Sequence, residues 1–157
     1  IGFVISVMAG EQDRIDIAQA AAQQLREVGI HCTVDIPAKM DWGGQQACLI
    51  GWGSPFDADD HTYKVFGTDK GANYSGYSNE KVDEYLTKAR ESSDPAVRKE
   101  YYDLFQVELA NDPAFAFICY IDANYVASSR LQGIAADTVM GHHGVGIFWN
   151  VREWTLD

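Results

Sequence analysis

Residues 51–61, with the sequence GWGSPFDADDH, concentrate side chains that could bind a solute or a metal ion. They include one tryptophan, three aspartates and one histidine, and they directly follow the apolar run ACLI. Carboxylates suit hard cations, imidazole suits zinc or nickel, and an aromatic ring can wall a ligand pocket. The segment therefore suggests a metal site, an acidic catalytic cluster or the rim of a binding pocket.

The spacing of the acidic residues excludes a calcium loop of the EF-hand type. Such a loop starting at Asp57 needs glycine and glutamate where this chain has Thr62 and Thr68. Aspartates at a helix start accept free backbone N–H groups and favour the positive end of the helix dipole. We therefore expect the acidic run to begin a short helix through residues 59–66.

A metal-dependent hydrolase remains an alternative hypothesis. Its metal ligands would come from the acidic run and from a histidine pair far along the chain: Asp57, Asp60, His142 and His143. The sequence contains no nucleophile elbow, Walker A loop, dinucleotide fingerprint or H-E-x-x-H motif. Catalysis thus has no positive support in the sequence, and we expect neither enzymatic activity nor a cofactor.

Composition and charge narrow the class of protein. A chain of 157 residues with 46% hydrophobic and 22% charged residues is typical of a globular domain, and we expect a single domain over 1–157. A formal net charge of −11 disfavours nucleic acid as a partner. The odd number of cysteines, none in a C-x-x-C pair, predicts buried free thiols at Cys32, Cys48 and Cys119.

The first 52 residues predict a β-α-β unit with a third strand. Apolar runs over 2–8 and 31–37 flank an amphipathic helix that ends at Gly29. This helix would bury the residues that repeat along one face: Ile15, Ala18, Ala22, Leu25 and Val28. This order implies a parallel strand pair, and 45–52 supplies another strand. The sequence therefore predicts an α/β fold.

Two more helices, after the short one over 59–66, and further strands are expected in the rest of the chain. Helix 77–93 has Ser78 or Asn79 as its cap, and helix 93–112 has Asp94 as N-cap and Pro95 at its first position. The second helix would bury one apolar face: Val97, Tyr101, Leu104 and Phe105. Residues 113–129 read as two strands with a turn at 122–124.

Aromatic and amide side chains mark the predicted binding site. Trp52 follows an apolar strand, at the end where ligands bind to open α/β sheets. Asn73 and Tyr74 lie in a loop of small residues and could present an amide and an aromatic face to a solute. For Tyr74, packing in the core is the alternative.

Several stretches together resemble the extracytoplasmic solute-binding proteins, family 5, of peptide- and nickel-type ABC importers. They are IAQAAAQQLREVGIHCTVD, LIGWGSPFDADD, the long stretch from NYSGYSNEKVDEYLTKARESSD to NDPAFAFICY, and LQGI. The resemblance covers most of the chain. It implies a type II periplasmic-binding-protein lobe with a mixed, mainly parallel sheet and flanking helices, and it identifies 1–157 as the C-terminal lobe region of a longer two-lobed protein.

The resemblance also implies how the protein would work. A peptide or related small solute would be held between this lobe and a missing N-terminal lobe, and delivered to an ABC importer permease from a periplasmic location. The predicted ligand-binding residues are Trp52, Gly53, Ser54, Asp57, Asn73 and Tyr74. Pro55 stands where peptide-binding members commonly carry an aspartate that pairs with the peptide's amino group, so peptide, opine-like, sugar-like and chelated-metal solutes all stay open.

Overall fold

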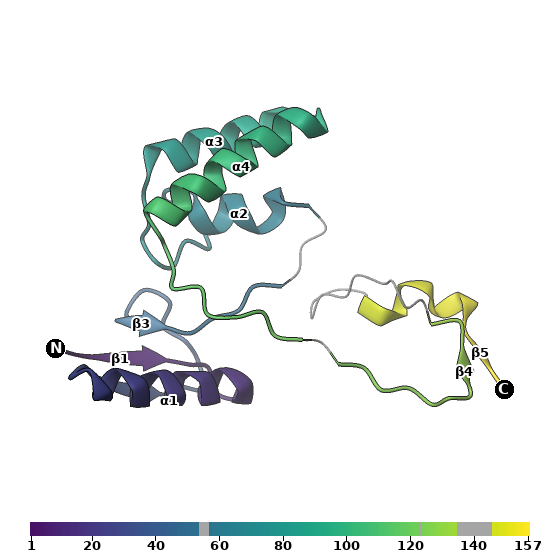
Figure 1. The fold of residues 1–157 in the computed structure, drawn as a ribbon, viewed down its shortest axis with the longest axis horizontal. Helices are drawn as coiled ribbons and strands as arrows, with labels where there is room; N and C mark the ends of the chain where they lie inside the picture. Colours follow the sequence, from purple (N-terminus) through teal and green to yellow (C-terminus); the bar gives the residue numbers. More distant parts are fainter. Residues whose placement is uncertain (54–56, 123, 135–145) are drawn as a thin grey trace. The chain divides into compact units, whose positions relative to one another are not determined.

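The computed structural model describes residues 1–53, 57–122, 124–134 and 146–157 (Figure 1). These residues divide into two compact units, 1–52 and 53–157. The prediction of a single domain over 1–157 stays a prediction. Among the described residues, no helix is long and apolar enough to cross a membrane.

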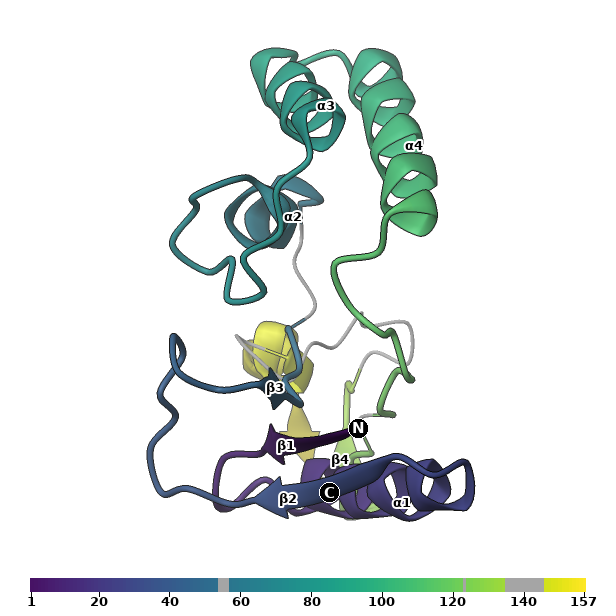
Figure 2. The same ribbon diagram turned by 90° about the vertical axis from the view of Figure 1, so that its left-hand side faces the viewer.

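The first unit is a parallel β-α-β arrangement, as predicted. It contains β1 (Gly2–Ser6), α1 (Gln12–Glu27), β2 (His31–Asp35) and β3 (Ala47–Cys48). Both β2 and β3 pair in parallel with β1, and Figure 2 shows the three strands side by side. The parallel sheet thus has β1 at its centre and one short edge strand.

The core of this unit lies between α1 and the sheet. Val7, Ile15 and Ala18 are buried there, with Ile5, Val34 and Leu49 packed against them. The predicted helix face is confirmed for Ile15, Ala18 and Ala22, whereas the prediction for Val28 is wrong, since it caps α1 and is 72% exposed. The helix has already ended there, because Gly29 adopts a positive φ of 82° that turns the chain.

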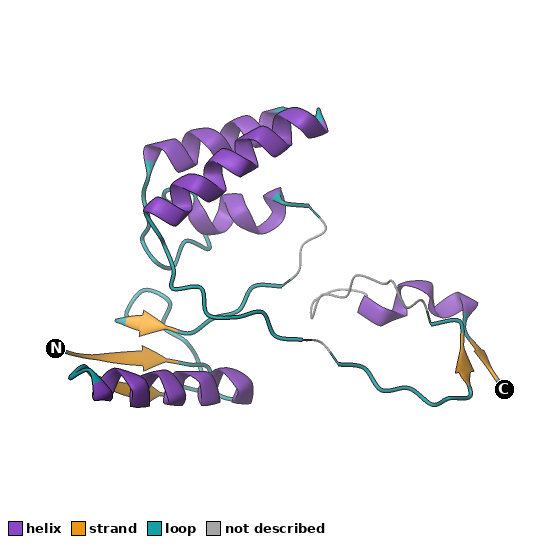
Figure 3. Ribbon diagram, in the orientation of Figure 1, coloured by secondary structure: helices purple, strands orange, loops and turns teal. Residues whose placement is uncertain are grey.

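The second unit contains a group of three helices (Figure 3). These are α2 (Asp59–Phe66), α3 (Glu80–Glu91) and α4 (Pro95–Asn111). Their shared core consists of buried side chains of α3 and α4, against which Tyr63 and Phe66 of α2 pack: Val82, Leu86, Ala89, Tyr102, Phe105 and Leu109. Phe105 is buried as predicted, but the prediction for Leu104 is wrong, because this side chain is 39% exposed and the buried face passes through Tyr102 and Leu109 instead.

Residues 113–129 carry no strand in their described part, contrary to the prediction. A strand needs a neighbouring backbone for its hydrogen-bond ladder, and the described residues offer this segment none.

The next strand is β4 (Leu131–Gln132). It pairs antiparallel with β5 (Thr155–Leu156), which follows the 3-10 segment η1 (Gly146–Glu153). The buried Asn150 ties this end together by donating to the Gly133 carbonyl and accepting from Trp154 Nε1, each at 2.9 Å.

Candidate functional site

The strand expected over 45–52, with Trp52 at its end, is shorter in the structure: β3 covers only Ala47–Cys48, and Trp52 follows it by four residues. The backbone N–H of Leu49 donates to the Ser6 carbonyl at 3.1 Å and so continues the contact with β1 beyond the two ladder residues. Gly51 lies against the Arg14 guanidinium, since a Cβ at this position would be 2.6 Å from Arg14 Nη2. This close approach favours glycine before Trp52, whose side chain is half-buried.

Gly53, the first residue of the second unit, is buried, whereas Ser54 and Pro55 lie outside the described residues. The backbone hydrogen bonds that Gly53 and Ser54 would offer a solute therefore stay a prediction. The first side chain described after this gap is that of Asp57, which is 60% exposed.

The acidic run begins α2, as predicted, and each of its three aspartates has a cationic partner. Arg98 Nη2 lies 2.6 Å from Asp57 Oδ1, Arg90 Nε lies 3.2 Å from Asp59 Oδ2, and Lys64 Nζ lies 3.1 Å from Asp60 Oδ1. Arg90 comes from α3 and Arg98 from α4. Two of the three ion pairs thus join the run to α3 and α4, while Lys64 belongs to α2 itself.

The Asp57 carboxylate has a second partner. Its Oδ1 also accepts the Asp59 backbone N–H at 2.8 Å, which satisfies a free donor in the first turn of α2. This hydrogen bond and the Arg98 guanidinium hold the pKa of the Asp57 carboxyl below its ordinary value. In the same way, the bond to Asp57 raises the pKa of Arg98. Asp57 is therefore a structural anion at the start of α2.

Asn73 closes the loop between α2 and α3. Its Nδ2 donates to the carbonyls of Gly67 at 2.9 Å and Tyr77 at 2.7 Å. Its Oδ1 accepts from the Tyr77 backbone N–H and from Ser75 Oγ, both at 3.1 Å. These four bonds use both ends of the amide, so the observed role of Asn73 is loop closure, and its contact with a solute stays a prediction, as does that of the half-buried Tyr74.

The structure does not support the hydrolase hypothesis. The described residues contain no group of three or more His, Cys, Asp or Glu side chains that could hold a metal ion. Asp57 and Asp60 are paired with cations as described, while His142 and His143 lie outside the described residues.

The three cysteines are free, but they differ in burial. Cys32 is buried as predicted and Cys48 is half-buried, where burial raises the pKa of its thiol. The prediction for Cys119 is wrong, because this side chain is exposed. It lies in the segment after α4, where the neighbouring side chains of Ile118 and Tyr120 are exposed as well.

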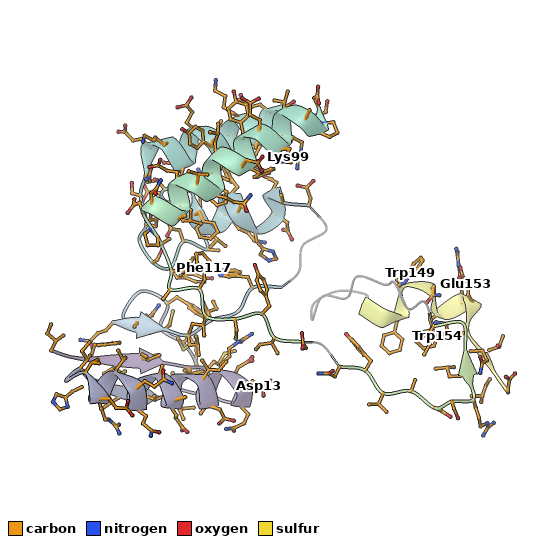
Figure 4. The ribbon with its side chains drawn as sticks, in the orientation of Figure 1. Asp13, Lys99, Phe117, Trp149, Glu153 and Trp154 are labelled. Carbon is orange, nitrogen blue, oxygen red and sulfur yellow. The ribbon has the colours of Figure 1, made fainter. Side chains whose placement is uncertain are left out.

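Two hollows were not predicted from the sequence. One of about 190 Å³ in the first unit lies where β1 and β2 end and is lined partly by Ser6, Asp35 and Lys39. The other, of about 450 Å³ in the second unit, is lined mainly by apolar side chains of α4 and the chain after it, including Leu109 and Phe117. Figure 4 labels Phe117 on that extended chain. Both hollows join residues that the sequence keeps far apart.

The parallel sheet, the Gly-Trp step after β3 and the packed helix pair define an α/β fold of the type II periplasmic-binding-protein class. No protein-family model matches the chain. It is, however, similar in structure to NikZ from Campylobacter jejuni in complex with Ni(L-His), with a TM-score of 0.81 and 37% sequence identity over 98% of this chain and 33% of NikZ.

Two further proteins are similar to the chain. Protein XP55 from Streptomyces lividans is 32% identical over 142 residues, which cover 84% of this chain and 26% of XP55. The oligopeptide-binding protein AppA from Bacillus subtilis is 25% identical over 98% of this chain and 29% of AppA, and its structure with a nonapeptide matches with a TM-score of 0.74. The resemblance to peptide- and nickel-type solute-binding proteins is thus confirmed, and the chain spans about a quarter to a third of the length of these relatives.

Proposed function

We propose that residues 1–157 form the C-terminal lobe region of a solute-binding protein that serves an ABC importer outside the cytoplasm. The observation that carries this proposal is the match to NikZ, at 37% identity and a TM-score of 0.81 over 98% of the chain. At this identity the similarity extends beyond the fold. The protein would bind its solute reversibly and change none of its bonds.

The binding surface that we propose includes Trp52 and the chain that follows it. Trp52 stands beyond the carboxyl end of β3, the side of an open α/β sheet where ligands bind. Its half-buried indole would wall or stack on the solute, backbone groups of Gly53 and Ser54 would hydrogen-bond it, and Asn73 and Tyr74 would border the cleft. A second lobe would close over the solute and supply the remaining contacts.

The solute classes to test first come from the two structural relatives, which were solved with a nickel–histidine complex and with a peptide. Isothermal titration calorimetry against Ni²⁺ with L-histidine and against short peptides tests both classes. The measurement uses the two-lobed protein that contains residues 1–157, because one lobe alone would supply only part of the contacts and should bind weakly or undetectably. The proposal predicts saturable binding of one class and no chemical change in the recovered solute. Absence of binding to both classes would contradict it.

Trp52→Ala is the variant that tests the site. We expect the dissociation constant to rise about five- to tenfold, which corresponds to the loss of about 1 kcal/mol of aromatic contact. Trp149→Ala is the matched control, because this exposed tryptophan belongs to the separate segment η1. Equal effects of the two substitutions would remove Trp52 from the site.

A further inference from the structure

We propose that residues 114–121, the docking segment, pair with an extended segment of the polypeptide outside residues 1–157 and receive one of its apolar side chains in the hollow beside α4. The inference rests on the proposed function, because it takes residues 1–157 to be part of a longer, two-lobed protein. The docking segment and the hollow both belong to the second unit.

The sequence of the docking segment is apolar throughout. Its eight residues, AFAFICYI, include no charged side chain. Successive side chains of a strand point to opposite faces, so Phe117, Cys119 and Ile121 would share one face of a strand. Ile118 and Tyr120 would lie on the other face. Continuous apolar runs of this length are typical of strands that are covered on both faces.

The described part of the chain supplies little of this cover. Phe117 is 70% exposed, Ile118 57% and Tyr120 102%. No backbone hydrogen bond joins the docking segment to another described residue, and Figure 3 shows it as a loop. Its N–H and C=O groups can therefore form a ladder with a second backbone.

The start of the docking segment is already fixed to the helix group. The centre of the Phe115 ring lies 5.5 Å from that of Phe66 in α2, which lies 5.4 Å from that of the buried Phe105 in α4. The Phe117 ring lies 6.2 Å from Phe115 and continues this series of rings towards solvent. Because one end is held in place, the segment loses less conformational freedom when it pairs.

The hollow of about 450 Å³ offers the partner a place for a side chain. Its lining is mainly apolar and includes Phe66, Leu109, Phe117 and Tyr120, which come from α2, α4 and the docking segment. Where a protein adds a strand, main-chain hydrogen bonds give affinity and pockets for side chains give specificity. We therefore expect a bulky apolar side chain of the partner segment to occupy the hollow.

Two observations favour the longer polypeptide over a second copy of this chain as the occupant. The matched structures of NikZ and AppA are covered to only 33% and 32%, so most of each relative lies outside the matched part. A second copy would bring a further formal net charge of −11, and like net charges oppose association. A partner segment in the same polypeptide, by contrast, has a high effective concentration.

Hydrogen exchange tests the docking segment without any solute. We expect the amides of residues 117–121 to exchange about tenfold or more slowly in the two-lobed protein than in residues 1–157 expressed alone. The amides of α4 should be protected in both and so report folding. Equal exchange of 117–121 in the two forms would overturn the proposal. Protection in residues 1–157 alone that rises with protein concentration would also overturn it, because the occupant would then be a second copy.

Substitutions in the two-lobed protein test the same contact. Ile118→Lys places a charge in the docking segment and should speed the exchange of 117–121 about tenfold. Val107→Lys is the matched control, because Val107 on α4 is similarly exposed, at 61%, and does not line the hollow. Ala110→Phe should fill the hollow from α4 and also speed this exchange. Equal effects of the two lysines would contradict the docking, and an unchanged exchange in Ala110→Phe would remove the hollow from it.

Exchange and solute titration decide different questions. If the two-lobed protein binds neither solute class but protects residues 117–121, the proposed function fails and the docking segment stands. If it binds a solute and leaves residues 117–121 unprotected, the docking segment fails and the proposed function stands.

Discussion

The Asn73 amide makes the largest set of side-chain hydrogen bonds in the loop between α2 and α3. It bridges the backbone at Gly67, where α2 ends, to the backbone at Tyr77, shortly before α3 begins. Few other side chains could replace it, because the position needs two donors and an acceptor together. The loop that would carry Tyr74 towards a solute is therefore shaped by its neighbour.

Replacing Asn73 with alanine should destabilise this loop. Several backbone groups would lose their partners, so we expect the free energy of unfolding to fall by about 2 kcal/mol in urea denaturation. Asn124→Ala is the control: that exposed amide makes one long local bond of 3.5 Å, and its loss should cost less than about 0.5 kcal/mol. Equal costs for both variants would contradict the loop-closing role.

The lowered pKa of Asp57 predicts a pH dependence with a definite sign. A carboxyl whose pKa is depressed in the folded state stabilises that state above its unfolded pKa of about 3.9, and this contribution disappears as the pH falls through the lowered value. The difference in unfolding free energy between wild type and Asp57→Asn should be constant near neutral pH and should shrink in acid. A difference that grows below about pH 4 would reverse the sign and contradict the assignment.

At the scale of helices, Asn79 performs two functions. Its Oδ1 accepts the N–H groups of Lys81 and Val82 and so caps α3. Its Nδ2 donates to Glu108 Oε1 at 3.2 Å and to Asp112 Oδ2 at 3.0 Å, which ties the start of α3 to the end of α4. A single amide therefore both starts one helix and connects it to the next.

Substitutions at Asn79 separate these functions. Asn79→Ala should lower the unfolding free energy by about 2 kcal/mol, compared with about 1 kcal/mol for Asp94→Ala, which removes a cap with one bond to Ala96 N–H. Asn79→Asp keeps a good cap but places a third carboxylate beside Glu108 and Asp112, so it should also destabilise. Chemical denaturation measures all three, and an Asn79→Asp variant as stable as wild type would show that the tie to α4 contributes nothing.

The helices were predictable because their signals are local. The start of α3 is marked by its capping residue Asn79, and the start of α4 by Asp94 and Pro95. The buried face of α4 was not fully predictable, because apolar residues occur around much of this helix. Packing against the neighbouring elements decides which of them face the core, such as Tyr102 rather than Leu104.

The candidate site shows the same limit more strongly. The sequence predicted a strand before Trp52, although the strand ends at Cys48, whereas the bond between Asp57 and Arg98 joins residues 41 positions apart. No local pattern predicts such a contact, because it depends on how α2 and α4 pack. The prediction of strands over 113–129 was wrong for a related reason. The apolar pattern is a local signal, but a strand forms only where a second backbone supplies its hydrogen bonds.

At the scale of the whole molecule, an apolar surface remains uncovered in the described residues. Ile118 is 57% exposed, Tyr120 102% and Val126 99%, in a chain segment with extended backbone and no ladder there. Exposed apolar segments of this kind promote association between chains.

Two lysines should suppress this association in residues 1–157 expressed alone. The variant with Ile118→Lys and Val126→Lys should stay monomeric to higher concentration in sedimentation, with an unfolding free energy within about 0.5 kcal/mol of the wild type. Leu86→Ala, at a fully buried position, should instead cost about 2–5 kcal/mol. A large loss of stability in the double-lysine variant would mean that the segment is buried in the isolated chain.

The two arginine–aspartate pairs also predict how related sequences should differ at these positions. Asp57 and Arg98, like Asp59 and Arg90, lie far apart in the chain yet share one bond each, so a change at one position alone leaves a charge without its partner. Related sequences should therefore vary at these positions in pairs, with both charges kept, exchanged or lost together.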